Sequence, residues 1–360
     1  MNTDILIIGA GLAGLSLAER LASQSRNVSL VEARDRVGGR VLSEAQGSAG
    51  FDLGPAWFWP GQPRMAALTT RFGLRVFEQN AEGDLLFEDE QGQVQRGHGY
   101  ASMEGSFRIE GGIASLVQAL SAQLPEGTLR LSSRVIQLER TPKSVIATLS
   151  SGETITASRV VLALPPRLAA QIKFVPALPP DAMGTLSQIP TWMAGQAKLV
   201  AIYAHPFWRA SGLSGDAMSR YGPMVEIHDA SPAQTGPFAL FGFVGLPPAA
   251  RRDETALKTK AIDQLIRLFG PKAADPVAVH LKDWAQDPDT ATEADQALLR
   301  THPRYGMPAE LDGLWDGALL FGGSECAPQF GGFLEGALEA AEDVATRLAR
   351  SKTDEAQYAG

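Results

Sequence analysis

Residues 4–34, DILIIGAGLAGLSLAERLASQSRNVSLVEAR, carry the strongest structural signal in the chain. An apolar run predicts a buried strand at about 4–8, helical spacing predicts a helix that ends at about 24, and a second apolar run predicts a strand at about 28–31. Gly9, Gly11 and Gly14 stand between the first strand and the helix in the pattern G-x-G-x-x-G. This strand–helix–strand unit is typical of a dinucleotide-binding α/β domain.

Each residue of the pattern has a mechanical role in holding a dinucleotide. The first glycine allows a tight turn, the second lets the backbone approach a pyrophosphate, and the third lets the helix pack against the strand. Glu32 ends the second strand, where a carboxylate binds ribose hydroxyls and repels the 2′-phosphate of NADP. The alternative is a glycine-rich turn that serves only packing, and it leaves Glu32 unexplained.

Residues 33–43, ARDRVGGRVLS, favour FAD over NAD. The segment resembles the R-x-G-G-R-x-x-S extension of FAD-dependent enzymes. Its two adjacent glycines, Gly38 and Gly39, permit a second close approach of the backbone to the cofactor. Arg40 can bind a pyrophosphate through two hydrogen bonds. For Arg34, Arg36 and Arg40 the alternative is ordinary solvated loop charge.

Composition narrows the class of partner. The 360 residues carry 40 acidic and 32 basic side chains, and the basic ones are scattered, which argues against nucleic acid or an anionic membrane as partner. Cys326 is the single cysteine, so no intrachain disulfide can form. The opening residues lack the pattern of a signal peptide, and no apolar run reaches the length of a spanning helix. We therefore expect a soluble cytoplasmic protein. The five histidines lack ligand spacing, so we expect no metal site.

A lysine lies inside an apolar run at residues 195–209, GQAKLVAIYAHPFWR. Strand alternation leaves both faces of this run largely apolar. Because burying an ammonium is costly, Lys198 is expected to lose its proton or to find a partner. The alternative is a lysine at a strand end whose ammonium reaches solvent. The pattern alone leaves both interpretations open.

Separate blocks of the sequence, in one order, extend the FAD signal along the chain. They are GAGLAGLSLAERL (9–21), EARDRVGGR (32–40), FDLGPAWFWPGQPR (51–64), FRIEGGIASLVQAL (107–120), SRVVLALPP (158–166), AKLVAIYAHPFWR (197–209), Trp284 and FGGSECAPQFGGFLEGALEAA (321–341). With these residues the chain resembles the flavin-containing monoamine oxidase family, which includes polyamine and L-amino-acid oxidases.

The resemblance implies an α/β fold: a Rossmann-like FAD-binding domain of the two-dinucleotide-binding flavoprotein type, with an interleaved mixed-sheet α+β substrate domain. We expect the FAD-binding domain in residues 1–77, 106–166 and 315–350, the substrate domain in 78–105 and 167–314, and a flexible tail in 351–360. No cysteine occupies the place where some relatives attach flavin, so FAD is expected to be bound non-covalently.

The resemblance also assigns cofactor contacts. It implies that Glu32 holds the ribose, Arg40 the pyrophosphate, and the Val135 backbone the adenine side, although Val135 could be an ordinary strand residue. The flavin ring is expected beside residues 54–57 and the start of the last helix at 332–334, and the 324–325 bend is expected to meet the ribityl and phosphate groups. The expected cofactor-binding residues are Gly9, Gly11, Gly14, Glu32, Ala33, Arg34, Gly39, Arg40, Gly54, Pro55, Ala56, Trp57, Val135, Trp284, Ser324, Glu325, Gly332, Phe333 and Leu334.

Lys198 falls where the family carries a lysine that holds a water against flavin N5, which makes it the expected catalytic residue. The implied reaction passes a hydride from the carbon next to an amine onto flavin N5, after which O₂ reoxidises FAD and releases hydrogen peroxide. The implied substrate is a small-molecule amine or amino acid. Two alternatives stay open: a dehydrogenase or desaturase with an acceptor other than O₂, and a flavoprotein subunit with little turnover.

Two features depart from the family pattern. Phe333 matches one of the two aromatic rings that relatives place before the flavin, but the other falls near DTATEADQ (289–296), which has no aromatic residue. Trp57, Phe333 and Tyr305 are the expected walls of the substrate pocket, with hydrophobic core as the alternative for each aromatic. The helical subdomain of relatives is reduced to about residues 78–105, which predicts an open site, or a homodimer or other partner that completes the pocket.

Overall fold

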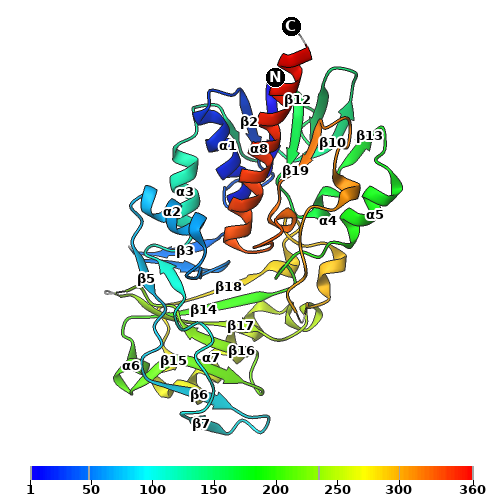
Figure 1. Cartoon of the computed structure of the whole chain (residues 1–360). Helices are drawn as coiled ribbons and strands as arrows, with labels where there is room; N and C mark the ends of the chain where they lie inside the picture. Colours follow the sequence, from blue (N-terminus) through cyan, green and yellow to red (C-terminus); the bar gives the residue numbers. More distant parts are fainter. Residues whose placement is uncertain (1, 48, 234–235, 300, 359–360) are drawn as a thin grey trace.

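The computed structural model of the chain describes residues 2–47, 49–233, 236–299 and 301–358. Two β-sheets form its upper and lower halves, and the chain passes between them several times (Figure 1). Within the described residues, no helix combines the length and the apolar character needed to cross a membrane.

The first sheet is built around the predicted strand–helix–strand unit. Strand β1 (Asn2–Ile8) pairs in parallel with β2 (Val28–Val31) and with β12 (Thr154–Leu162), and helix α1 (Leu12–Ser23) connects β1 to β2. The sheet order is β13-β10-β11-β12-β1-β2-β9, and β19 also pairs with β12. The remaining strands are β9 (Leu129–Arg130), β10 (Val135–Arg140), β11 (Val145–Leu149), β13 (Lys173–Val175) and β19 (Leu319–Phe321).

Helices cover one face of this sheet because their apolar sides match its apolar strands. Helix α1 packs against α3 (Ala114–Ala122) and against the long C-terminal helix α8 (Leu334–Tyr358). Leu15, Leu116 and Leu338 meet in the buried core of this layer. Beside it lie helix α2 (Pro63–Arg71) and two short ribbons, β3 (Ser43–Gln46) with β4 (Ala49–Asp52) and β5 (Val76–Glu78) with β8 (Phe107–Ile109).

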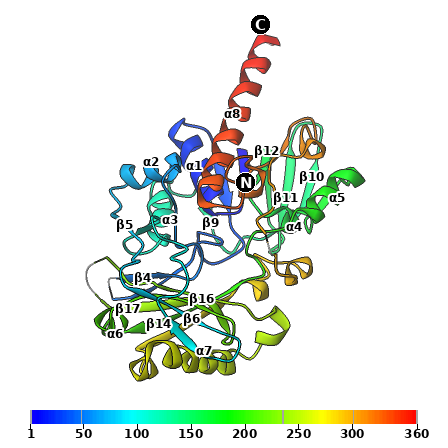
Figure 2. The ribbon, with the colours of Figure 1, turned by 60° about the horizontal axis from the view of Figure 1, so that its bottom comes forward.

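The second sheet has the order β18-β14-β17-β16-β15-β6-β7 and is mixed, because β6 and β15 pair in parallel while its other pairs are antiparallel. Its strands are β6 (Asp84–Glu88), β7 (Val94–Arg96), β14 (Ala197–Tyr203), β15 (Leu213–Ser219), β16 (Met224–Asp229), β17 (Phe238–Val244) and β18 (Ala278–Asp283). The short helix α6 (Phe207–Ala210) follows β14. Helix α7 (Glu254–Phe269) covers the side that faces away from the first sheet (Figure 2).

The proline-rich segment after β12 packs with the first sheet rather than with the second. Strand β13 pairs with β10, and the helices α4 (Pro166–Ala169) and α5 (Pro180–Gln188) pack onto the same core through buried side chains such as Leu186. We had expected residues 167–314 in the substrate domain. A strand of three residues between prolines shows no readable alternation, so its partner could not be inferred from the pattern. We propose that the substrate domain begins after α5.

The C-terminal helix also extends further than expected. Helix α8 continues to Tyr358, through most of the segment 351–360 that we had assigned to a flexible tail, and residues 359–360 lie outside the described part of the chain. Residues 351–358, SKTDEAQY, contain no glycine or proline, and their Lys, Glu, Ala and Gln favour a helix.

Candidate active site

A cavity of about 400 Å³ runs from the glycine turn after β1 to strand β14 of the second sheet. It lies at the carboxyl ends of β1 and β2, where open α/β sheets bind their ligands. Most of the expected site residues line it: Gly9, Gly11, Glu32, Ala33, Arg34, Gly39, Arg40, Gly54, Pro55, Ala56, Trp57, Val135, Lys198, Trp284, Ser324, Gly332, Phe333 and Leu334. Three expected residues, Gly14, Glu325 and Tyr305, are not part of the lining.

The three glycines of the turn have different tasks. A Cβ on Gly14 would lie 1.9 Å from the carbonyl oxygen of Gly9, so this glycine lets α1 pack closely on the turn. Gly9 has a φ of +105°, which favours glycine. A Cβ added to Gly11 would meet only the Gly38 carbonyl oxygen, at 3.9 Å, and would otherwise point into open space. The absence of a side chain at Gly11 therefore leaves room for a ligand in the cavity. Helix α1 begins after Gly11 without a side-chain cap, which leaves its first N–H groups available to an anion.

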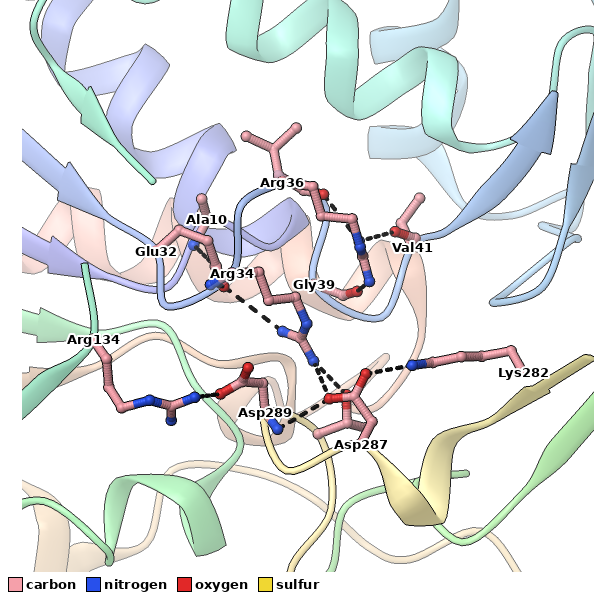
Figure 3. Close-up of polar contacts among 12 residues, drawn as sticks. Ala10, Glu32, Arg34, Arg36, Gly39, Val41, Arg134, Lys282, Asp287 and Asp289 are labelled. Atoms are coloured by element: carbon pink, nitrogen blue, oxygen red, sulfur yellow. Dashed lines mark hydrogen bonds and ion pairs between the residues drawn. The ribbon is translucent and has the colours of Figure 1, made fainter. Parts of the chain in front are cut away.

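Glu32 is held at the adjoining wall of the cavity. Its Oε2 accepts a hydrogen bond from the Ala10 amide at 2.8 Å (Figure 3), and its Oε1 accepts one from the Arg34 amide at 3.0 Å. The Ser133 amide donates to the Glu32 carbonyl at 2.7 Å and so brings the start of β10, with Val135, to the same wall. A carboxylate oriented in this way retains lone pairs that can accept hydrogen bonds from ribose hydroxyls.

Arg40 gives the middle of the cavity its positive charge. Its Nη1 forms an ion pair with Glu325 Oε1 at 2.7 Å, and its Nη2 donates to Ser324 Oγ at 3.0 Å. Glu325 is fully buried, so it acts through Arg40 instead of contacting a ligand itself. A guanidinium, a helix N-terminus and glycine backbone on one cavity fit the two negative charges of the FAD pyrophosphate.

The other two arginines of the segment are engaged by the protein (Figure 3). Arg34 donates from Nη2 to Asp287 Oδ1 at 2.8 Å, while Arg36 donates to backbone carbonyls, including that of Gly39 at 2.9 Å. Arg36 thereby fixes the glycine loop that faces the cavity. The sequence offered no signal for Asp287, because it lies far from Arg34 along the chain.

Lys198 lies near the start of β14, beside the edge strand β18 of the second sheet, and lines the cavity. It is only 2% exposed, and its Nζ donates to the Gly54 carbonyl at 3.1 Å and lies 3.9 Å from the Phe241 ring centroid. The pKa of Lys198 is lowered to about 7, chiefly because the amine is buried. The charge of Asp52 opposes this shift, and the charge of Arg108 adds to it. The amine therefore titrates near neutrality and does not reach solvent.

Aromatic side chains form the walls at this end of the cavity: Trp57, Trp59, Trp192, Phe243 and Phe333. Trp59 meets Phe333 edge to face, with ring centroids 6.3 Å apart, and Phe333 is 37% exposed at the mouth. Trp284, farther along the wall, donates from Nε1 to the Leu53 carbonyl at 2.9 Å. Trp192 was missed from the sequence, although an aromatic residue in a loop between Pro190 and Gly195 is a signal for a binding wall.

Tyr305 lies behind this wall, not in it. Its hydroxyl donates to the Pro190 carbonyl at 2.8 Å, and a Cβ added to Gly331 would lie 2.3 Å from the Tyr305 Cβ. His302 stacks on Phe333 with ring centroids 4.7 Å apart and contacts Tyr305 edge to face. The pair therefore supports Phe333 from behind, which corrects the expectation that Tyr305 contacts substrate.

The short segment expected to replace the helical subdomain does not cover the cavity. Residues 84–96 form the β6–β7 hairpin at the edge of the second sheet, far from the first sheet in Figure 1, and none of residues 78–105 lines the cavity. Cys326 also lies outside the lining, and burial raises the pKa of its thiol to about 12. This thiol is therefore unsuited to attach a flavin.

Comparison with known proteins identifies the protein family to which the chain belongs. The family model described as flavin containing amine oxidoreductase matches residues 12–99 and 84–349. Putrescine oxidase of Kocuria rosea is 24% identical, over 85% of this chain and 87% of that protein. An L-amino acid dehydrogenase of Synechocystis is 23% identical, over 96% of this chain and 95% of that protein. That alignment spans 464 positions against the 360 residues here, so the relative carries segments that this chain lacks.

Solved structures share the fold. Cyclohexylamine oxidase from Brevibacterium oxydans has a TM-score of 0.81, at 20% identity, over 98% of this chain and all of that one. Wild-type putrescine oxidase bound to putrescine has a TM-score of 0.79, at 20% identity, over 97% of this chain and 99% of that one. These similarities confirm the expected fold class, and the family match confirms the resemblance and FAD as the cofactor. The chain belongs to the family of flavin-containing amine oxidoreductases.

Proposed function

We propose that the protein oxidises a small-molecule amine or amino acid, with FAD as the electron acceptor and O₂ as the final oxidant. The observation that carries the proposal is Lys198, a buried amine in the wall of a cavity that cofactor-binding residues and aromatic side chains share. When bound, FAD accepts a hydride equivalent at N5 from the carbon next to the amine nitrogen and passes two electrons to O₂, which gives hydrogen peroxide. The oxidised amine leaves as an imine, which water hydrolyses.

The chain's residues bind and orient the cofactor without a covalent bond. Arg40 and the N-terminus of α1 hold the pyrophosphate, and Glu32 holds the ribose. Glu325 positions Arg40 through the 2.7 Å ion pair, and Ser324 restrains its other Nη atom. Lys198 and the aromatic walls, at the other end of the cavity, would then face the flavin ring.

Lys198 serves as the proton-carrying group and water ligand at that end. With a pKa of about 7, its amine is present in both protonation states near neutral pH, so it can accept a proton in one step and return it in another. The Gly54 carbonyl holds one of its protons in place and thereby orients the amine.

The aromatic walls favour an amine that also carries apolar surface. Ring faces attract cations and pack against apolar groups, and Trp59 and Phe333 present such surfaces at the mouth. Because no residue of 78–105 lines the cavity, the mouth admits a larger substrate, or a second copy of the chain or another partner covers it. The proposal includes a cytoplasmic location, which a chain with a single cysteine permits.

The test is anaerobic mixing of the purified flavoprotein with a panel of amines and amino acids. We expect at least one compound to bleach the flavin absorbance, and air to restore it with release of peroxide. Lys198→Met should retain FAD and slow flavin reduction or reoxidation, whereas Lys173→Met, at an exposed lysine of β13, should not. An unchanged rate for Lys198→Met would remove this residue from the mechanism.

A second candidate is a dehydrogenase that uses an acceptor other than O₂. The alignment with a protein named L-amino acid dehydrogenase over 96% of this chain favours it. Bleaching by substrate without peroxide in air, together with reduction of an added quinone or dye, would support this candidate over the oxidase. A flavin that no compound bleaches would contradict both.

A further inference from the structure

A segment that begins three residues after Trp284 is bound by side chains from both halves of the molecule, Lys282 from the second sheet and Arg34 from the first. We call Asp287–Thr290 the strap. Asp289 and Thr290 line the cavity, as do Glu32 and Val135, and they contact the neighbours of those two residues: Thr290 accepts from Arg34, and Asp289 pairs with Arg134. The strap is folded on itself, because the Thr290 amide donates to the Asp287 carbonyl at 3.0 Å and the Asp289 amide donates to Asp287 Oδ1 at 3.0 Å.

Arg34 ties the strap to the first sheet. Its Nη2 donates to Asp287 Oδ1 and to Thr290 Oγ1, each at 2.8 Å. The Arg34 side chain is 11% exposed and that of Asp287 is 9% exposed, so water screens this link poorly. Arg34 also remains 3.7 Å from Glu32 Oε1, and the strap thus contacts the residue that holds Glu32 in place.

Lys282 supports the same carboxylate from the second sheet. Its Nζ donates to Asp287 Oδ2 at 2.6 Å, so both oxygens of Asp287 are engaged by cations from different sheets (Figure 3). Burial by itself would raise the pKa of the Asp287 carboxyl, but these two cations outweigh it, so the pKa of Asp287 is lowered. Charges therefore alternate along Lys282, Asp287, Arg34 and Glu32, from the second sheet to the first.

A second ion pair lies at the outer side of the strap. Arg134, which directly precedes Val135 at the start of β10, pairs with Asp289 (Figure 3). The Arg134 side chain is 46% exposed and that of Asp289 is 17% exposed, so this link is more accessible to solvent than the first. Three of the four residues in these links, Arg34, Arg134 and Asp289, line the same cavity, whereas Asp287 does not.

We propose that the strap is a latch that retains FAD: the Arg34–Asp287 and Arg134–Asp289 pairs close the cavity beside the ribose-binding residue, and the cofactor leaves only when they open. The inference rests on the proposed function, because it requires FAD in this cavity. Arg34 then acts on the cofactor by holding the strap, and its role as a direct FAD ligand is secondary.

Charge balance explains why the latch needs its cations. An unpaired Asp287 carboxylate beside the cavity would repel the negative pyrophosphate and would lie partly buried without a partner. With Arg34 and Lys282 bound to it, the strap closes over the cofactor without adding net negative charge. Asp287→Asn removes the charge that holds Arg34 and Lys282 while it keeps the shape of the side chain.

The test measures FAD release from holoprotein. Diluted holoprotein is filtered at intervals, and the flavin absorbance of the filtrate gives the release rate. Loss of one part-buried ion pair is expected to speed release about ten-fold or more for Asp287→Asn and for Arg34→Gln. Because the two residues form one link, the double variant should release FAD little faster than either single variant. Arg134→Gln, at an exposed arginine where folding is at little risk, should speed release a few-fold.

Arg130→Gln is the matched control. It breaks the 2.8 Å ion pair between Arg130 and Glu153, on β9 of the same sheet, and Arg130 does not line the cavity. Its release rate should equal that of the wild type. The proposal is overturned if wild-type protein holds FAD and the strap variants release it at the wild-type rate, even when the apoprotein melts at a lower temperature. Wild-type protein that binds no FAD would overturn both this inference and the proposed function.

Discussion

Replacing Lys198 with methionine should stabilise the FAD-free protein at neutral pH. Burial lowers the pKa of Lys198 from 10.5 to about 7 in the folded state. Between these values the unfolded chain binds a proton that the folded chain does not bind, so the free energy of unfolding of the wild type rises with pH across this window. Below about pH 7 both states hold the proton, and the destabilisation is constant.

The magnitude follows from the difference between the pKa of Lys198 in the unfolded chain and in the folded protein. At 1.36 kcal/mol per pKa unit, the buried lysine lowers the free energy of unfolding by about 4 kcal/mol at pH 7 and by about 2 kcal/mol at pH 9. Methionine has a similar length but loses the hydrogen bond to the Gly54 carbonyl, which removes about 1 kcal/mol of the gain. Lys198→Met is therefore expected to be about 3 kcal/mol more stable than the wild type at pH 7 and about 1 kcal/mol more stable at pH 9.

The assay is urea unfolding of FAD-free protein at pH 7 and pH 9, because bound cofactor would add its own stabilisation. Lys173→Met, at an exposed lysine on β13, is the control and should stay within about 0.5 kcal/mol of the wild type at both pH values. A Lys198→Met protein that is less stable than the wild type at pH 7, or whose advantage is the same at pH 7 and pH 9, would refute the reasoning.

Four further substitutions separate the effects of packing, charge and substrate contact. Gly14→Ala should prevent folding or lower stability by about 3 kcal/mol or more, because its Cβ would lie 1.9 Å from a carbonyl oxygen, whereas Gly11→Ala should fold and lose FAD affinity; thermal melts and FAD titration distinguish them. Asp52→Asn removes a charge that raises the pKa of Lys198, so the midpoint of the pH–rate profile should move to lower pH; a midpoint that stays or rises would contradict this. Trp59→Ala should raise KM for the best amine about ten-fold with a smaller change in kcat, since a wall contact binds substrate and transition state alike; an unchanged KM in steady-state kinetics would exclude that contact.

Local patterns of the sequence were sufficient for the elements that build the FAD site. The strand–glycine turn–helix unit depends on neighbours within residues 4–34, and the structure places β1, α1 and β2 within a few residues of the predicted bounds. Alternation around Lys198 likewise predicted a strand with two largely apolar faces, but it left open whether the amine is buried; the structure shows the lysine 2% exposed. Both signals are local, so they required no knowledge of what packs against them.

Contacts between distant segments could not be predicted in this way. Tyr305 was expected in the pocket, but its hydroxyl finds the Pro190 carbonyl, and its ring lies behind Phe333. Residues 167–314 were expected in the substrate domain, but β13 within this range pairs with β10 of the first sheet. In both cases the partner lies in another part of the chain, and packing, not local spacing, selects it.

The sequence by itself therefore determined an FAD-binding α/β unit and an apolar strand that contains a lysine, because the spacing of glycines, apolar residues and charge within short windows dictates local structure. Only the tertiary structure decided which groups face the cofactor and which hold those groups. Glu325 meets Arg40, and Asp287 meets Arg34, across most of the chain. Such ion pairs depend on how segments far apart in the chain pack against each other, and no local pattern encodes that distance.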